Sequence, residues 1–167
     1  LDEALMQVEK ESNVDALYLV DSFGALYSEQ ISHLAKKYKS IMPTKEIGIH
    51  AHNNQQLAFA NTIEAIIQNV NYLDGTIFGI GRAAGNCPLE LLLGFLKNPK
   101  YDLRPILEIL ESHFVKLKEE IEWGYTIPYM ITGILDLHPR AGMKLRKSES
   151  KDDYLGFFDS LAQSDSA

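Results

Sequence analysis

Two histidines one residue apart are the side chains of this sequence best suited to chemistry. His50 and His52 lie in the segment 48–54 (GIHAHNN), which we interpret as the end of a β-strand followed by a loop. Because alternate side chains of a strand share a face, both imidazoles are expected on one polar face. The opposite face is expected to be apolar and to carry Ile47, Ile49 and Ala51. Two imidazoles so placed can bind one divalent cation, although the pattern also suits two histidines that only make hydrogen bonds in a loop.

Composition narrows the class of protein. A chain of 167 residues with 46% hydrophobic content can bury one core, which predicts one globular domain. The net charge of −7, with no basic run, argues against a nucleic-acid partner. A single cysteine excludes an internal disulfide and a cysteine-based zinc cluster, and favours a reducing cytoplasm. No apolar run approaches the ~20 residues of a membrane helix, and no signal peptide is visible.

The chain starts inside a helical pattern. Leu1, Leu5 and Val8 share one helical face, and no initiator methionine precedes them. We therefore expect a cut or incomplete chain.

The first two-thirds of the sequence alternate β-leaning and helical patterns. Strands are expected at 15–20, 46–52 and 73–78, with helices before the first strand, after Ser28 as an N-cap, across 59–70 and after Pro88. Such alternation predicts an α/β fold with parallel strands, either a barrel or a doubly wound sheet. In both, the carboxyl ends of the strands carry the chemistry. The Asp21 turn, the histidine pair and the glycine-rich loop 79–86 (GIGRAAGN) are all expected there.

The last third is predicted to be helical. A helix after Asp102 carries an apolar face that we expect to pack in the core, made of Leu103, Leu107, Leu110, Phe114, Leu117 and Ile121. A helix at 127–137 is apolar nearly all round, which indicates burial or an interface. A small docking helix with Tyr154 and Phe158 is expected in the charged, serine-rich tail. The predicted divisions are 1–98, 99–147 and 148–167.

Two segments resemble a known enzyme family. Residues 48–61 (GIHAHNNQQLAFAN) and 73–90 (LDGTIFGIGRAAGNCPLE) resemble the aldolase and acyltransferase superfamily that includes 4-hydroxy-2-oxovalerate aldolase, hydroxymethylglutaryl-CoA lyase and isopropylmalate synthase. The aldolase branch is the most similar. These enzymes are TIM (β/α)8 barrels that hold a divalent metal. The resemblance implies that residues 1–98 are the C-terminal part of such a barrel, about strands six to eight, followed by C-terminal helices.

The resemblance also implies a set of site residues. His50 and His52 would be metal ligands, Asn86 a ligand or near neighbour of the metal, and Asp21 with Ser22 part of the substrate pocket. Mixed nitrogen and oxygen ligands suit Mn²⁺ or Mg²⁺, and Zn²⁺ or Co²⁺ also fit. Such a metal chelates a 2-oxo acid and acts as a Lewis acid when a carbon–carbon bond breaks. Arg82 is either a charged contact to substrate or a solvated loop arginine.

The chain departs from the family at its first strand, which supplies an acidic ligand and a neighbouring arginine. Nothing here matches that strand or strands two to five, so the acidic ligand and the general base are expected outside these residues. The expected partners are therefore the missing N-terminal half and a 2-oxo acid, in a homo-oligomer, and the segment alone is expected to be inactive. Cys87 is expected to pack, and Asn53 with Asn54 to cap the loop.

Two other functions stay open at this point. A barrel hydrolase can use a His-x-His pair to activate water, although in amidohydrolases that pair lies on the first strand and here another strand–helix unit precedes it. A non-catalytic binding segment is the second alternative, because the apolar helix at 127–137 suits an interface.

Overall fold

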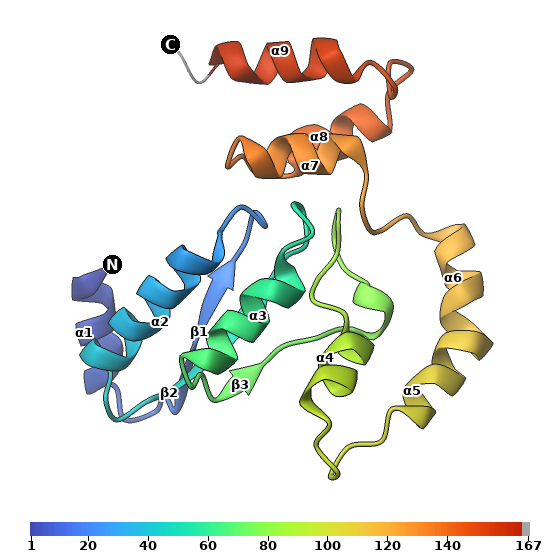
Figure 1. Ribbon diagram of the computed structural model, residues 1–167. Coiled ribbons are helices and arrows are strands. Elements are labelled where there is room, and N and C mark those ends of the chain that lie inside the picture. Colours follow the sequence, from blue (N-terminus) through green and yellow to red (C-terminus); the bar gives the residue numbers. More distant parts are fainter. Residues whose placement is uncertain (165–167) are drawn as a thin grey trace.

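The computed structural model describes residues 1–164, and its first part alternates helices and strands as predicted (Figure 1). The elements of this part are α1 (Asp2–Lys10), β1 (Ala16–Asp21), α2 (Ser28–Ile41), β2 (Glu46–Ala51), α3 (Ala58–Ile67), β3 (Tyr72–Leu73) and α4 (Leu89–Leu96). The strands form one parallel sheet in the order β1-β2-β3. The predicted α/β class and parallel pairing are therefore confirmed.

The two faces of strand β2 differ as the alternation predicts. Ile47, Ile49 and Ala51 are at most 1% exposed and pack in a core with residues of α2 and α3, including Ile31 and Ala58. This face forms the main core because both crossover helices lie against it, as parallel connections require. The helix α2 starts at Ser28 with Tyr27 as its N-cap, one residue earlier than the predicted cap, and Gln30 closes the turn by accepting the Tyr27 N–H.

The other face of the sheet carries bulky side chains that stay accessible. Val20 is 49% exposed and Tyr72 is 48% exposed, and the ring of Tyr72 lies 6.3 Å from that of Tyr18. A Cβ at Gly48 would lie 2.5 Å from the Tyr18 ring, so a larger residue here would force that ring to move. His50 pairs with Val20 in the strand register and belongs to the same face.

The predicted strand at 73–78 is wrong beyond its first residue. Strand β3 ends at Leu73, and Ile77–Gly79 forms a 3-10 turn in which Phe78 has φ 56°. Tertiary contacts explain the difference, because the Phe78 ring packs edge-on against Trp123 and its carbonyl accepts the Trp123 indole N–H at 2.9 Å. Phe78, which was predicted to belong to a strand, therefore contacts a distant part of the chain instead.

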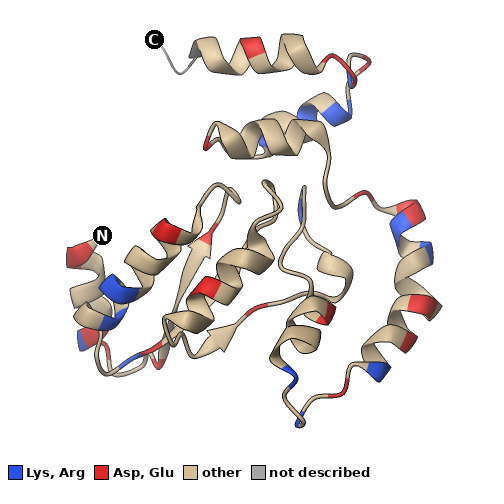
Figure 2. Cartoon of the chain, in the orientation of Figure 1, with Lys and Arg blue, Asp and Glu red and all other residues tan. Residues whose placement is uncertain are grey.

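The helix predicted after Asp102 forms, but its predicted burial is wrong. It comprises α5 (Arg104–Ile109), a π turn (Leu110–Phe114) and α6 (Val115–Glu120), and Asp102 Oδ1 accepts the Arg104 N–H at 2.9 Å. None of its residues is buried: Leu107 is 50% and Val115 52% exposed. The helix lies beside α4 and away from the sheet, with charges of both signs along it (Figures 1 and 2). The predicted apolar face is nevertheless partly covered within residues 1–164, because Leu103, Leu110, Phe114 and Leu117 are half-buried and the π turn lies against the 3-10 turn Ile77–Gly79.

Three C-terminal helices complete the described chain, namely α7 (Ile127–Ile134), α8 (Arg140–Arg146) and α9 (Tyr154–Ser164). Helix α7 ends before the predicted 137, because Asp136 takes φ 51° and the Leu137 N–H turns back to the Thr132 carbonyl. Helices α7 and α8 lie across the loops that follow the strands (Figure 1). Among residues 1–164, no helix combines the length and apolar character that a membrane span requires.

Candidate metal centre at the carboxyl ends of the strands

Backbone hydrogen bonds bring the three predicted polar segments together. The His52 N–H donates to the Asp21 carbonyl at 3.3 Å, and the Asn53 N–H donates to the Gly85 carbonyl at 2.9 Å. His52 and Asn86 also form an antiparallel bridge. The ends of β1 and β2 and the glycine-rich loop therefore meet at one edge, as parallel strands demand.

The two imidazoles are neighbours at this edge. The ring centroids of His50 and His52 are 5.1 Å apart. His50 Nδ1 lies 3.0 Å from Asp74 Oδ2, which leaves Nε2 as the ring nitrogen for a ligand bond. A carboxylate that accepts from one ring nitrogen fixes the tautomer and orientation of a metal-binding histidine. This arrangement suits His50 to metal binding through Nε2.

Sequence reasoning missed Asp74. Ile49 pairs with Leu73 in the sheet, so the residues that follow them, His50 and Asp74, lie side by side. An acidic residue one position after a short strand, next to a histidine strand, could have indicated a supporting carboxylate.

His52 is held in the form that binds metals. Burial, together with smaller effects of the nearby His50 and Arg82, lowers its pKa to about 4. The imidazole is therefore neutral at pH 7, as ligation requires.

Asn86 offers an oxygen without a partner. Its Nδ2 donates to the Ile80 carbonyl at 3.1 Å, whereas its buried Oδ1 has no hydrogen-bond partner within the described chain. A buried acceptor left unpaired costs about 1–3 kcal/mol, so a metal or a substrate donor at this oxygen would offset a real penalty. A Cβ at Gly81 would lie 2.6 Å from Asn86 Nδ2, which shows how closely the loop encloses this side chain.

These residues fit a metal with mixed ligands but do not complete its coordination. Residues 1–164 contain no group of three or more His, Cys, Asp or Glu side chains placed to hold an ion. Two imidazoles and one amide oxygen suit a divalent ion that takes further oxygen ligands.

The three residues expected to touch substrate have different surroundings. Asp21 is 3% exposed, and its carboxylate accepts the Ala25 N–H at 3.0 Å and the Leu26 N–H at 3.3 Å. Burial raises the pKa of Asp21, and these backbone donors oppose that rise. Its carboxylate thus builds the turn after β1. Ser22 and Arg82 are exposed, and Arg82 Nη2 donates to the Ser22 carbonyl at 3.5 Å.

The loop after His52 is anchored by the C-terminal helices. Asn53 Oδ1 accepts the Ala58 N–H at 3.1 Å, and Gln55 Nε2 donates to the carbonyls of Ala25 and Gly133, each at 3.2 Å. Asn54 is fully buried under α7 and donates to the Tyr129 carbonyl at 3.4 Å. Both asparagines therefore hold the loop, as predicted.

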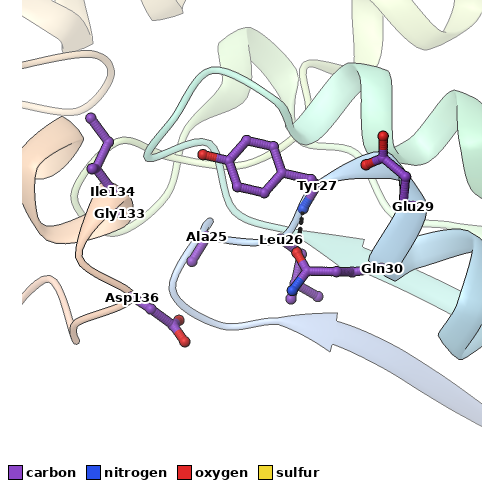
Figure 3. Close-up of a pocket in the computed structure, with 8 residues that line it drawn as sticks. All are labelled: Ala25, Leu26, Tyr27, Glu29, Gln30, Gly133, Ile134 and Asp136. Atoms are coloured by element: carbon purple, nitrogen blue, oxygen red, sulfur yellow. Dashed lines mark hydrogen bonds between the residues drawn. The ribbon is translucent and has the colours of Figure 1, made fainter.

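Figure 3 shows the hollow between the turn after β1 and the end of α7, lined by Ala25, Leu26, Tyr27, Glu29, Gln30, Gly133, Ile134 and Asp136.

Cys87 is a packing residue. Its side chain is fully buried in the core beside Leu92, and burial raises the pKa of the thiol to about 11. A neutral, inaccessible thiol is a poor nucleophile and a poor ligand.

The HMGL-like family profile matches residues 2–112. The chain belongs to the HMGL-like family. It is 38% identical over 101 residues to 4-hydroxy-2-oxovalerate aldolase of Thermus thermophilus, covering 58% of this chain and 29% of that protein. It is 35% identical over 88 residues to oxaloacetate decarboxylase of Mycobacterium tuberculosis, covering 53% and 26%. The chain thus spans about a third of the length of the curated relatives it matches.

Solved structures agree with this membership. The N-terminal domain of a putative aldolase from Bacteroides vulgatus superposes with a TM-score of 0.73 at 33% identity, over 80% of this chain and 46% of that chain. The carboxyl transferase domain of Rhizobium etli pyruvate carboxylase, solved with pyruvate, gives 0.70 at 15% identity, over 97% and 28%. At 15% identity, the similarity to the carboxyl transferase domain concerns the fold alone, and it includes the C-terminal helices. The resemblance drawn from residues 48–61 and 73–90 is confirmed at the level of the family.

Proposed function

We propose that this chain is part of a divalent-metal-dependent aldolase that cleaves or forms a carbon–carbon bond of a 2-oxo acid, similar to 4-hydroxy-2-oxovalerate aldolase. The observation that carries the proposal is the pair of His50 and His52 beside the unpartnered oxygen of Asn86. Relatives named as aldolases at 33–38% identity support the reaction class.

The proposed enzyme is a TIM barrel to which residues 1–98 contribute about strands six to eight. Residues 99–147 would form a helical extension and 148–167 a tail. A parallel sheet with one core face and one accessible face supports this division. The N-terminal half would supply the acidic ligand and the general base, and we propose a homo-oligomer in the cytoplasm.

In this proposal His50, His52 and Asn86 hold a divalent ion, with Mn²⁺ or Mg²⁺ as the first choice and Zn²⁺ or Co²⁺ as alternatives. The bound ion supplies Lewis-acid stabilisation of negative charge on an oxygen of the 2-oxo acid. Asp74 keeps His50 in one tautomer, and burial keeps His52 neutral. The α7 helix holds the loop after His52 in place through Gln55 and Asn54.

Metal titration and proton exchange test this function in the natural polypeptide that carries these residues. We expect Mn²⁺ binding, and we expect deuterium exchange at the pyruvate methyl group that depends on the metal. Metal-dependent hydrolysis without exchange would favour a barrel hydrolase. Absence of metal binding would favour a non-catalytic binding segment.

Replacing Asn86 by alanine is expected to weaken metal or substrate binding more than it lowers the free energy of unfolding, because the lost oxygen has no hydrogen-bond partner among residues 1–164. Cys87→Ser is the matched comparison from the next residue and should have a mild effect on activity, since that side chain is fully buried in the core. Calorimetric titration and urea unfolding of both variants measure the two effects. An inactive Cys87→Ser beside an active Asn86→Ala would reverse the assignment.

Replacing Asp74 by alanine is expected to weaken metal binding about 10–100-fold, the usual effect of losing a carboxylate behind a metal-binding histidine. Asp74→Asn keeps an acceptor for His50 Nδ1 and should recover part of the affinity. Mn²⁺ titration followed by electron paramagnetic resonance measures both variants, with the exposed Asp15→Ala as control. Equal affinity of Asp74→Ala and the parent would show that His50 needs no support.

Acid is expected to destabilise the metal-free protein partly through His52. Its pKa of about 4 in the folded protein lies below the ordinary 6.5, so the unfolded state binds more protons between these pH values. The stabilising contribution is full above about pH 6.5 and is lost as the pH falls toward 4. Urea unfolding in chelator at several pH values should show a smaller acid loss in His52→Gln than in the parent. The exposed His33→Gln should behave like the parent.

A further inference from the structure

Three loops meet beside the metal centre at a pair of basic side chains. Arg82, in the glycine-rich loop, places Nη1 3.4 Å from Nε2 of His138, which follows α7. Arg82 Nη2 donates to the Ser22 carbonyl, and the His138 ring packs edge-on against Phe23 at 5.5 Å between centroids. The C-terminal helical segment therefore contributes a side chain to the rim of the site.

This pair has more hydrogen-bond donors than acceptors. His138 Nδ1 accepts the Arg140 N–H at 3.1 Å, which puts the ring proton of the neutral imidazole on Nε2. Nε2–H then faces a guanidinium, which has donors only. In the other tautomer the ring proton is on Nδ1, so the Arg140 N–H points at a second donor instead of an acceptor. In either tautomer one of these N–H groups lacks an acceptor among residues 1–164.

The charge of Arg82 is also uncompensated. Ion pairs among residues 1–164 use Lys37, His50, Arg104 and Arg146, and none uses Arg82. Burial lowers the pKa of His138, and the positive charges of Arg140 and Arg82 lower it further. Asp136 lines a hollow with Ser22 and Phe23 but makes no ion pair with Arg82. A carboxylate between the guanidinium and Nε2–H would accept from both and supply the missing negative charge.

We propose that Arg82 and His138 form a subsite for the distal carboxylate of the substrate, so that the preferred substrate is a 2-oxo acid with a second carboxylate. This rests on the proposed function, in which the 2-oxo acid group itself binds at His50, His52 and Asn86. Arg82 is four residues before Asn86 in the same loop and is exposed at the rim, whereas His52 is half-buried. The subsite therefore receives the end of the substrate farther from the reacting carbon.

Ligand binding by the natural polypeptide with Mn²⁺ tests the subsite. The probes are pyruvate, with one carboxylate, and 2-oxoglutarate, with two, measured by calorimetry. For Arg82→Gln and for His138→Ala the Kd of 2-oxoglutarate should rise about 10-fold, the size of a lost charge-assisted hydrogen bond, while the Kd of pyruvate changes less than about twofold. Arg82→Lys keeps the charge without the fork and should give an intermediate value. Lys144→Gln removes an exposed charge from α8 and should change neither Kd.

Equal losses for pyruvate and 2-oxoglutarate would overturn the subsite, because the pair would then serve a group common to both acids or the loop itself. Retained 2-oxoglutarate binding in both variants would also overturn it. His52→Ala separates this from the metal proposal: it should weaken both acids if they bind the ion. If His52→Ala changes neither acid while Arg82→Gln weakens only 2-oxoglutarate, the metal proposal fails and the subsite stands.

Discussion

Replacing His52 by alanine in the natural polypeptide is expected to abolish metal-dependent turnover, and His50→Ala should do the same. Each variant removes one of two neighbouring imidazoles, so the ion loses a ligand and the reaction loses Lewis-acid stabilisation. Effects of about 10²-fold or more on rate are ordinary when a group that stabilises transition-state charge is removed. The measurement is turnover of a 2-oxo acid at several Mn²⁺ concentrations.

The fold should survive these changes. The backbone around His52 is held by hydrogen bonds to Asp21 and from Asn53 to Gly85, none of which needs the imidazole. Circular dichroism should therefore match the parent, and the exposed His33→Ala should keep full turnover. Turnover of His52→Ala within about twofold of the parent at saturating metal would remove the histidine pair from the mechanism.

Local alternation was enough to predict which face of β2 would be buried. Ile47, Ile49 and Ala51 repeat every second residue, and any core packed on one side of the strand must bury them together. The placement of the histidines at the carboxyl edge followed from the same pattern and from parallel pairing. These features depend only on neighbours in sequence and on the handedness of the crossovers.

Features set by distant partners were not predictable in the same way. The strand predicted at 73–78 failed because Phe78 contacts Trp123, 45 residues away. Asp74 and His138 gain their roles from contacts with residues distant in the sequence, His50 and Arg82 among them, which no periodicity encodes. The helix after Asp102 was predicted correctly, but its apolar face was wrongly expected to be buried in the core. Amphipathic spacing shows that a face needs a partner but not which partner.

The surface of this chain is larger than that of a compact protein of its size. Its accessible area is 10057 Å², whereas a monomer of 18.8 kDa is expected to expose about 8,300 Å². The excess accessible area, roughly 1,750 Å², is about twice the area that one partner buries in a standard protein–protein interface. Exposed apolar side chains contribute to it: the accessible sheet face holds Val20 and Tyr72, and α5 and α6 expose Leu107 and Val115.

We therefore expect that the 167-residue chain alone is not a stable, active monomer. Open sheet edges and exposed apolar faces pair with other chains unless they are covered. The free energy of unfolding of a domain is only about 5–15 kcal/mol, and roughly 25 cal/mol is forfeited for each Å² of apolar area left in water. The chain should self-associate or aggregate, and it should bind Mn²⁺ far more weakly than the proposed whole enzyme, in which an acidic ligand from the N-terminal half completes the site.

Sedimentation velocity and Mn²⁺ titration of the purified chain, with and without the N-terminal half as a separate polypeptide, test this expectation. Adding that half should convert the associating chain into a discrete complex and restore metal binding. Val115→Glu should reduce self-association of the chain alone if the face of α6 takes part, whereas the neighbouring exposed change Lys116→Glu should not. A monodisperse monomer with micromolar metal affinity and full aldolase activity would instead show that these residues form a complete small domain, and the division of a barrel between two segments would have to be abandoned.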